Sequence, residues 1–118
     1  GKVGYHDYEG FLTGPEEEKR LSAVFKQAKV VILRAHGMIV WGRSVHEAYL
    51  LCYYLNRACE AQVASNAGAV PAYTPPQWVI DKVPGEASIT TDGNASYPKM
   101  CWEALLRKLD RQAPDFRN

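Results

Sequence analysis

Two short apolar runs, separated by only three residues, restrict the possible folds of this chain more than any other feature. Residues 29–34 read KVVILR, and residues 38–41 read MIVW. Apolar runs that are rich in β-branched residues and lack polar alternation are typical of strands buried on both faces. The break over residues 35–37 is short enough for a tight hairpin. The pattern therefore predicts an α/β fold, with helices on both sides of a sheet.

Three stretches of the chain have the spacing and the end signals of helices. Residues 15–28 begin with a proline and three glutamates, which suit the positive end of a helix dipole. Ser44 and Glu47 form a capping box, which opens a helix that runs to about residue 67. A last helix is expected over residues 97–111, because apolar residues recur there at helical spacing.

The helix expected over residues 44–67 is apolar on two sides. One stripe is aliphatic, and a second stripe includes Tyr49, Tyr53 and Tyr54. A helix that is apolar nearly all round is usually buried on two sides. A chain of 118 residues has little second layer to cover it. We therefore expect a partner chain at this helix.

Two other segments lack a clear helical pattern. Residues 1–14 are predicted to form a loop with one short strand. Residues 69–94 contain four prolines and many serines and threonines. This frequency of proline, serine and threonine predicts a long loop or meandering arm rather than a linker between folded units.

The composition argues against several classes of function. Fourteen basic and thirteen acidic residues give a formal net charge of +1, which provides no strong field for nucleic acid or an anionic membrane. The apolar runs are far shorter than the roughly 20 residues that span a bilayer. The three cysteines lack zinc-site or disulfide-framework spacing. We therefore expect no nucleic-acid partner, no membrane insertion and a cytoplasmic location.

His36 is the candidate for chemistry, because it lies in the break between two strands and precedes Gly37. An imidazole at a strand end suits a metal ion, since the sheet fixes the ring and the glycine leaves room. The alternative is a histidine that hydrogen-bonds a carbonyl of the turn. A catalytic metal needs about three protein ligands, and the other histidines are His6 and His46. The residues alone leave the function undecided.

Several segments become informative when they are taken together. The central ones are VILRAHGMIVWG at residues 31–42, SVHEA at 44–48 and RACEAQ at 57–62. Around them lie YHDYEG at residues 5–10, EEE at 16–18 and WEALLRKLDR at 102–111. This combined pattern closely resembles the class II aldolase/adducin family. The resemblance covers almost the entire chain apart from the proline-rich stretch.

The resemblance implies a fold and an assembly. Members of the family form a three-layer α/β/α sandwich with a central, mainly antiparallel sheet, and they are commonly tetramers with sites at subunit boundaries. Their domain is roughly twice as long as this chain. Residues 1–118 are therefore expected to be the C-terminal half of such a domain. The expected partners are the N-terminal half of the same fold, or a second chain that carries it, and further copies in a homotetramer.

The resemblance also implies a metal site. Aldolase and epimerase members hold a divalent metal, usually zinc, with three histidines, of which the third lies in a His-Gly turn. This position corresponds to His36 as metal ligand. The other two come from a His-x-His pair in the first half of the domain, which has no counterpart in these residues. A tyrosine near the chain end often assists catalysis, and Tyr97 is the nearest candidate by position.

The function that follows is that of a metal-dependent, aldolase/epimerase-like carbon–carbon lyase acting on a hydroxy-carbonyl, sugar-like compound. The metal in such enzymes acts as a Lewis acid on the enediolate. The alternative is an adducin-like or catalytically silent oligomeric scaffold domain of the cytoskeleton. His36 does not separate the two, because adducin also can keep the His-Gly turn.

Overall fold

The α/β class predicted from the sequence is confirmed by a computed structural model of the chain. The structure describes residues 2–10, 14–91 and 96–117. They fall into two compact units, Gly1–Pro71 and Ala72–Asn118, which are treated separately below. The first unit contains the sheet and His36, and the second is helical in its described part.

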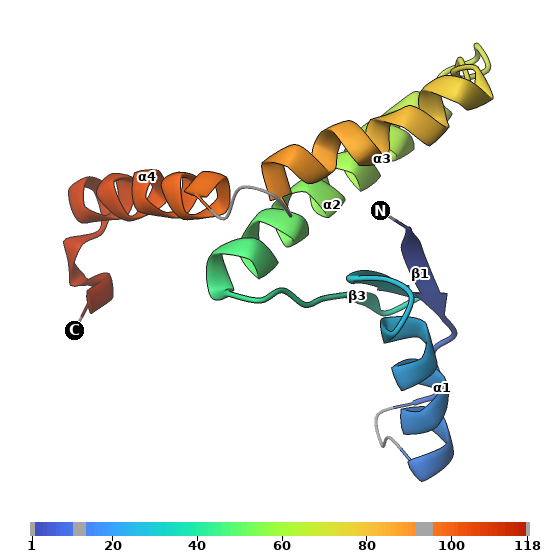
Figure 1. The fold of residues 1–118 in the computed structure, drawn as a ribbon, viewed down its shortest axis with the longest axis horizontal. Coiled ribbons are helices and arrows are strands. Elements are labelled where there is room, and N and C mark those ends of the chain that lie inside the picture. Colours follow the sequence, from blue (N-terminus) through green and yellow to red (C-terminus); the bar gives the residue numbers. More distant parts are fainter. Residues whose placement is uncertain (1, 11–13, 92–95, 118) are drawn as a thin grey trace. The chain divides into compact units, whose positions relative to one another are not determined.

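A three-stranded mixed sheet forms the centre of the first unit (Figure 1). Strand β1 (Val3–His6) pairs in parallel with β2 (Val30–Leu33), and β2 pairs antiparallel with β3 (Gly37–Val40). The predicted hairpin and the predicted short N-terminal strand are both confirmed. With one parallel and one antiparallel pair, the mainly antiparallel sheet and the three-layer sandwich remain predictions for the larger domain.

Helix α1 (Pro15–Phe25) packs against one face of this sheet. A Cβ atom on Gly4 would lie 2.5 Å from the side chain of Val24 and 3.2 Å from that of Val31, so the helix approaches the strands closely here. Val31 is fully buried. The helix begins at proline as predicted but ends three residues earlier than expected, with Lys26 as its C-cap.

The second helix, α2 (Val45–Asn66), contacts the opposite face of the sheet. Successive residues of a strand point to opposite faces, and Met38 stands one position from Ile39, which pairs with Val31. The Met38 sulfur lies 3.9 Å from the Cys52 sulfur of α2. Strand alternation thus separates the residues that meet α1 from those that meet α2.

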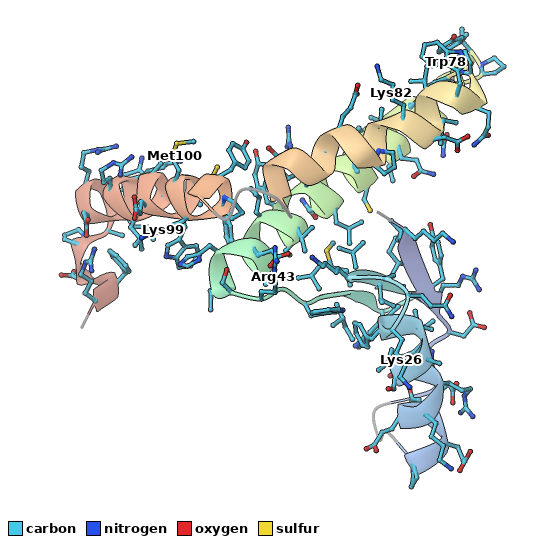
Figure 2. The ribbon with its side chains drawn as sticks, viewed as in Figure 1. Lys26, Arg43, Trp78, Lys82, Lys99 and Met100 are labelled. Carbon is cyan, nitrogen blue, oxygen red and sulfur yellow. The ribbon has the colours of Figure 1, made fainter. Side chains whose placement is uncertain are left out.

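The N-terminus of α2 is tied to the start of β2 through Glu47, which is only 4% exposed. Ser44 Oγ accepts a hydrogen bond from the Glu47 backbone N–H at 3.2 Å, as the capping box predicts. The Glu47 carboxylate accepts from Lys29 Nζ at 2.8 Å and from the backbone N–H of Arg43, also at 2.8 Å. Figure 2 labels Arg43, whose side chain also lies 3.4 Å from this carboxylate.

Hydrogen bonds also hold the ends of β2 and β3 together. Trp41 follows β3, and its indole N–H donates to the Ala28 carbonyl at 3.2 Å. Its backbone N–H donates to the Lys29 carbonyl at 3.0 Å, one residue beyond the paired ends of β2 and β3. The hairpin is therefore closed at its open end by a side chain and a backbone contact together.

The second unit corrects one prediction. Residues 69–94 were expected to form a long loop, but Gln77–Thr91 form helix α3, and residues 92–94 lie outside the described residues. Pro75 and Pro76 precede the helix rather than break it, and the Pro76 carbonyl accepts from the backbone N–H of Val79 at 2.9 Å. Pro84 lies inside the helix. The loop prediction is therefore confirmed for residues 69–76 and wrong for Gln77–Thr91, because it counted the prolines without regard to their positions.

The last elements of the second unit are α4 (Ser96–Gln112) and the short 3-10 helix η1 (Pro114–Arg117). Helix α4 matches the helix predicted over residues 97–111. The Arg117 guanidinium pairs with the Asp110 carboxylate at 2.9 Å, which holds η1 beside the end of α4. No helix in the described ranges is both long and apolar enough to cross a membrane.

Candidate functional site

The hairpin between β2 and β3 places His36 at an exposed turn. The His36 backbone N–H donates to the Leu33 carbonyl at 3.1 Å, which closes the turn. Ala35 has φ of 58°, in the left-handed region that non-glycine residues seldom adopt. The His36 side chain thus projects from a backbone that is constrained on both sides of it.

The end of β1 lies directly beside this turn. The backbone N–H of Arg34 donates to the His6 carbonyl at 2.9 Å, which extends the parallel pairing by one residue. The Arg34 guanidinium bonds the Asp7 carboxylate at 2.8 Å and lies 5.3 Å from the centre of the Tyr5 ring. Three contacts of one arginine therefore join the turn to β1 and to the residue that directly follows it.

The ring of Tyr8 stacks on the imidazole of His36. Their centroids are 4.9 Å apart, and the ring planes differ by 10°. An offset, nearly parallel arrangement of this kind is a favourable geometry for two aromatic rings. His36 is thus held by a side chain from a segment that is distant in sequence.

A buried histidine and two carboxylates lie on the α1 side of the same region. His6 is 8% exposed, and its Nε2 lies 3.4 Å from Glu17 Oε1 and 4.0 Å from Glu9 Oε1. Arg20 bonds the Glu9 carboxylate through two nitrogens, and this hydrogen bond holds the pKa of Glu9 below its ordinary value. The cluster joins the end of β1 to α1.

These groups surround a hollow of about 180 Å³. Its lining residues are His6, Asp7, Tyr8, Gly10, Glu17, Leu21, Leu33, His36 and Ile39. The aliphatic members come from the strands and α1, and the polar members come from β1, the segment after it, α1 and the β2–β3 turn. A hollow with an apolar floor and a few polar groups suits a small polar ligand or part of one.

The described residues do not fit a complete metal site. Within the described ranges, no three His, Cys, Asp or Glu side chains are grouped closely enough to hold a metal ion. His36 is exposed, and an imidazole nitrogen is a good metal ligand. His6, in contrast, already bonds Glu17. These residues can supply a ligand to a metal but not a full set.

The structure places the remaining candidates elsewhere. His46 is in the first turn of α2, where its Nδ1 lies 3.1 Å from Ser44 Oγ, in agreement with a helix-terminal residue and not a ligand. Tyr97 is in the first turn of α4 and is half-buried. It belongs to the second unit, whereas His36 belongs to the first. Its catalytic role stays a prediction.

The residues that sequence reasoning missed are those around His36. Tyr8 and Glu17 were noted as parts of a motif, without a role at the site. A signal for Tyr8 existed in the segment YHDYEG, which combines aromatic and ionisable residues at the end of a short strand. Its use required knowing that β1 pairs in parallel with β2, and a four-residue strand does not reveal its pairing partner.

Comparisons with known proteins point to one family. The model described as "Class II Aldolase and Adducin N-terminal domain" matches residues 1–63, which include the whole hollow and its turn. A solved structure titled as an aldolase II superfamily protein from Pseudomonas syringae is similar to the full length of this chain, with a TM-score of 0.89 and 37% identity. The chain covers 47% of that structure.

Relatives in two branches resemble the chain to a similar degree. A "Putative aldolase class 2 protein" of Pseudomonas aeruginosa is 35% identical over 98% of this chain, which spans 45% of that protein. Alpha-adducin of Rattus norvegicus is 35% identical over 93% of this chain, which spans 16% of that protein. The chain thus spans about half the length of the aldolase-type relative and a smaller part of the adducin.

Proposed function

The chain belongs to the class II aldolase and adducin family, and from this premise we propose that it is part of a metal-dependent, aldolase- or epimerase-type carbon–carbon lyase. The proposed substrate is a hydroxy-carbonyl, sugar-like compound. Family membership supports this class of chemistry. The observation that carries the proposal is the exposed imidazole of His36 at a constrained turn beside a polar-lined hollow.

His36 is proposed as one ligand of a divalent metal, with zinc as the preferred ion. The described residues supply no complete ligand set, so the other ligands would come from outside them. This agrees with our proposal that residues 1–118 form the C-terminal half of a larger domain. The 45% coverage of the Pseudomonas aeruginosa relative supports the part of this proposal that concerns length, since the chain spans about half of that protein. The N-terminal half would be provided by the same fold or by a second chain.

The proposed roles of the remaining groups are narrower. Tyr97 is proposed as a catalytic tyrosine, because the family often uses one near the chain end. The proposed cellular location is the cytoplasm, and the proposed assembly is a homotetramer. Each of these three proposals is inferred from the family to which the chain belongs, and each can be measured directly.

Metal content tests the proposal most directly. The native protein should contain about one divalent ion per chain by elemental analysis, because a catalytic site holds a bound ion. Replacing the imidazole in His36→Gln should lower the affinity for Zn²⁺ at least about tenfold. His46→Gln is the matched control, since His46 is at the start of α2, and it should keep the metal.

A second function is favoured by a specific observation, the similarity to alpha-adducin over 93% of this chain. It is an adducin-like or catalytically silent oligomeric scaffold domain of the cytoskeleton. The same measurements separate the two. A native protein free of divalent metal, with His36→Gln indistinguishable from wild type in metal content and assembly, would support the scaffold and contradict the lyase.

A further inference from the structure

Strand β1 lies at one edge of the described sheet, because the strand order is β1-β2-β3. The N–H and C=O of one strand residue point to the same side of the strand, and successive residues alternate. The His6 carbonyl accepts from the Arg34 N–H, directly after β2, so the backbone groups of His6 and Gly4 face β2. The N–H and C=O of Val3 and Tyr5 therefore point away from β2, to the open edge.

The side chains of Val3 and Tyr5 lie on the face of the sheet that α2 contacts. Tyr5 pairs with Ile32 and Ile32 with Met38, whose sulfur meets that of Cys52 in α2. Paired residues share a face, and so do residues two positions apart. Even so, Val3 is 40% and Tyr5 54% exposed. Among the described residues, α2 thus leaves the β1 end of this face uncovered.

A second hollow, of about 270 Å³, lies beside β1 and the C-terminal part of α1. We call it the edge hollow. Its lining residues are Lys2, Val3, Gly4, Tyr5, Ala23, Val24, Gln27 and Ala28. It is several times larger than the roughly 30 Å³ of one water molecule, so a side chain can enter it. The open backbone edge is thus flanked by a hollow next to α1 and by exposed side chains on the α2 face.

These features suit an added strand better than another kind of partner. Native proteins usually protect a free strand edge with proline, charged residues or a bulge. The four residues of β1, VGYH, include no proline and no lysine. An added strand would bond the outward backbone groups and place alternate side chains on the two faces. One element would then satisfy the backbone edge, the edge hollow and the exposed side chains together.

We propose that the open edge of β1 pairs with a strand from the part of the larger domain that lies outside residues 1–118. Its side chains would fill the edge hollow and cover Val3 and Tyr5. The inference rests on the proposed larger domain and not on a metal ion. The chain matches the Pseudomonas syringae structure along its full length, with a TM-score of 0.89, and covers 47% of it. More than half of that related polypeptide thus lies outside the matched part, which is ample length for such a strand.

Amide hydrogen exchange of the native protein, followed by NMR, tests the proposal. The Tyr5 N–H should exchange at least about a hundredfold more slowly than in an unstructured peptide, because a bonded amide exchanges only when the structure opens. It should also show a nuclear Overhauser contact with a residue outside 1–118. The His6 N–H is the internal reference. It faces β2 and should be protected whether or not the edge is covered.

Val3→Pro removes an N–H that points to the edge. Proline is tolerated at the first residue of an edge strand, so pairing with β2 should persist. The Tyr5 amide should then exchange about tenfold faster than in wild type, since a neighbouring hydrogen bond is lost, while His6 stays protected. Val3→Thr is the matched control, because it keeps the N–H and a similar shape. It should leave both amides at their wild-type rates.

A Tyr5 amide that exchanges as fast as in an unstructured peptide would overturn the proposal. So would the absence of any contact between Tyr5 and a residue outside 1–118, which is the result expected if a second copy of β1 covers the edge. Wild-type exchange of Tyr5 in Val3→Pro would also contradict it. If that variant loses protection of His6 as well, the contacts of Tyr5 in the wild-type protein decide.

The metal measurement distinguishes this inference from the proposed lyase. A native protein without divalent metal, but with a protected Tyr5 amide that contacts an outside strand, would contradict the lyase and support the added strand. A metal-containing protein with a freely exchanging Tyr5 amide would overturn the added strand alone.

Discussion

The carboxylate of Glu47 shows how one side chain can connect three parts of a fold. Burial alone would raise the pKa of this carboxyl group. The hydrogen bonds from Lys29 Nζ and from the Arg43 backbone N–H, with the charge of Lys29, outweigh burial and hold the pKa of Glu47 below its ordinary value of 4.5. The ionised form is therefore stabilised more in the folded protein than in the unfolded chain.

Glu47→Gln should lower the free energy of unfolding by about 1–3 kcal/mol at pH 7, because the ammonium of Lys29 loses its charged, buried acceptor. The sign of the pH effect follows from the lowered pKa. Stability from Glu47 is complete above its ordinary, unfolded-state pKa of 4.5 and is lost as the pH falls through the lower folded pKa. Urea unfolding of wild type and Glu47→Gln between pH 7 and pH 3 measures the difference.

The matched control is Glu60→Gln on the same helix. The Glu60 carboxylate bonds Arg57 at 2.6 Å, but both side chains are exposed, and exposed pairs contribute little to stability. Its substitution should change the unfolding free energy by less than about 1 kcal/mol. Equal losses for the two variants, or a Glu47 effect that persists unchanged to pH 3, would contradict this account of Glu47.

Residue-level prediction from sequence succeeded where partners are close along the chain. The capping contact between Ser44 and Glu47 spans one helical turn, so its pattern is visible in the sequence. Lys29 and Glu47 are 18 residues apart in the sequence, and Tyr8 and His36 are 28 residues apart. These contacts depend on strand pairing, which no local pattern specifies.

Among the α-helices of the described residues, α3 is the one that the sequence did not predict. Its signals are pairs at helical spacing, such as Gln77 with Asp81 and Lys82 with Glu86. The prolines before it and inside it outweighed those signals. By contrast, the hairpin and the capped start of α2 were predictable, because each depends on a short, uninterrupted pattern.

Pro84 gives a prediction about this helix. A proline in a helix interior lacks the N–H that would bond the carbonyl four residues earlier, here that of Ile80, and costs about 3 kcal/mol relative to alanine. Pro84→Ala should therefore stabilise the second unit by about 1–3 kcal/mol and increase its helical circular dichroism.

Pro75→Ala is the comparison for this prediction. Pro75 is exposed and precedes the helix, so its replacement mainly gives the unfolded chain more freedom. It should lower stability by less than about 1 kcal/mol. If Pro84→Ala instead destabilised the protein as much as Pro75→Ala, Pro84 would not lower the stability of α3.

At the scale of the whole molecule, α2 presents more apolar surface than its own unit covers. Tyr49, Tyr53 and Tyr54 on this helix are 41%, 50% and 51% exposed. Clustered aromatic residues at a surface are typical of protein–protein contacts. This agrees with the proposed homo-oligomer, for which the sequence pattern of the helix was the first indication.

We therefore predict that the native protein sediments as a species larger than a single copy at micromolar concentration. Tyr53→Glu should lower its mass, because a charge is costly in an apolar contact. Ser65→Glu adds the same charge to an exposed position near the end of α2 and should leave the mass unchanged. A wild-type protein that is monomeric, or equal masses for the two variants, would count against an interface at α2.

The hydrogen bond from Trp41 to the Ala28 carbonyl gives the protein an internal fluorescent probe. Trp41 is in the first unit, and the other two tryptophans, Trp78 and Trp102, are in the second. In a protein with phenylalanine at positions 78 and 102, tryptophan emission would come from Trp41 of the first unit alone. Denaturant titrations followed by this emission and by helical circular dichroism would then show whether the sheet unit loses its structure in the same step as the helices or in a separate one.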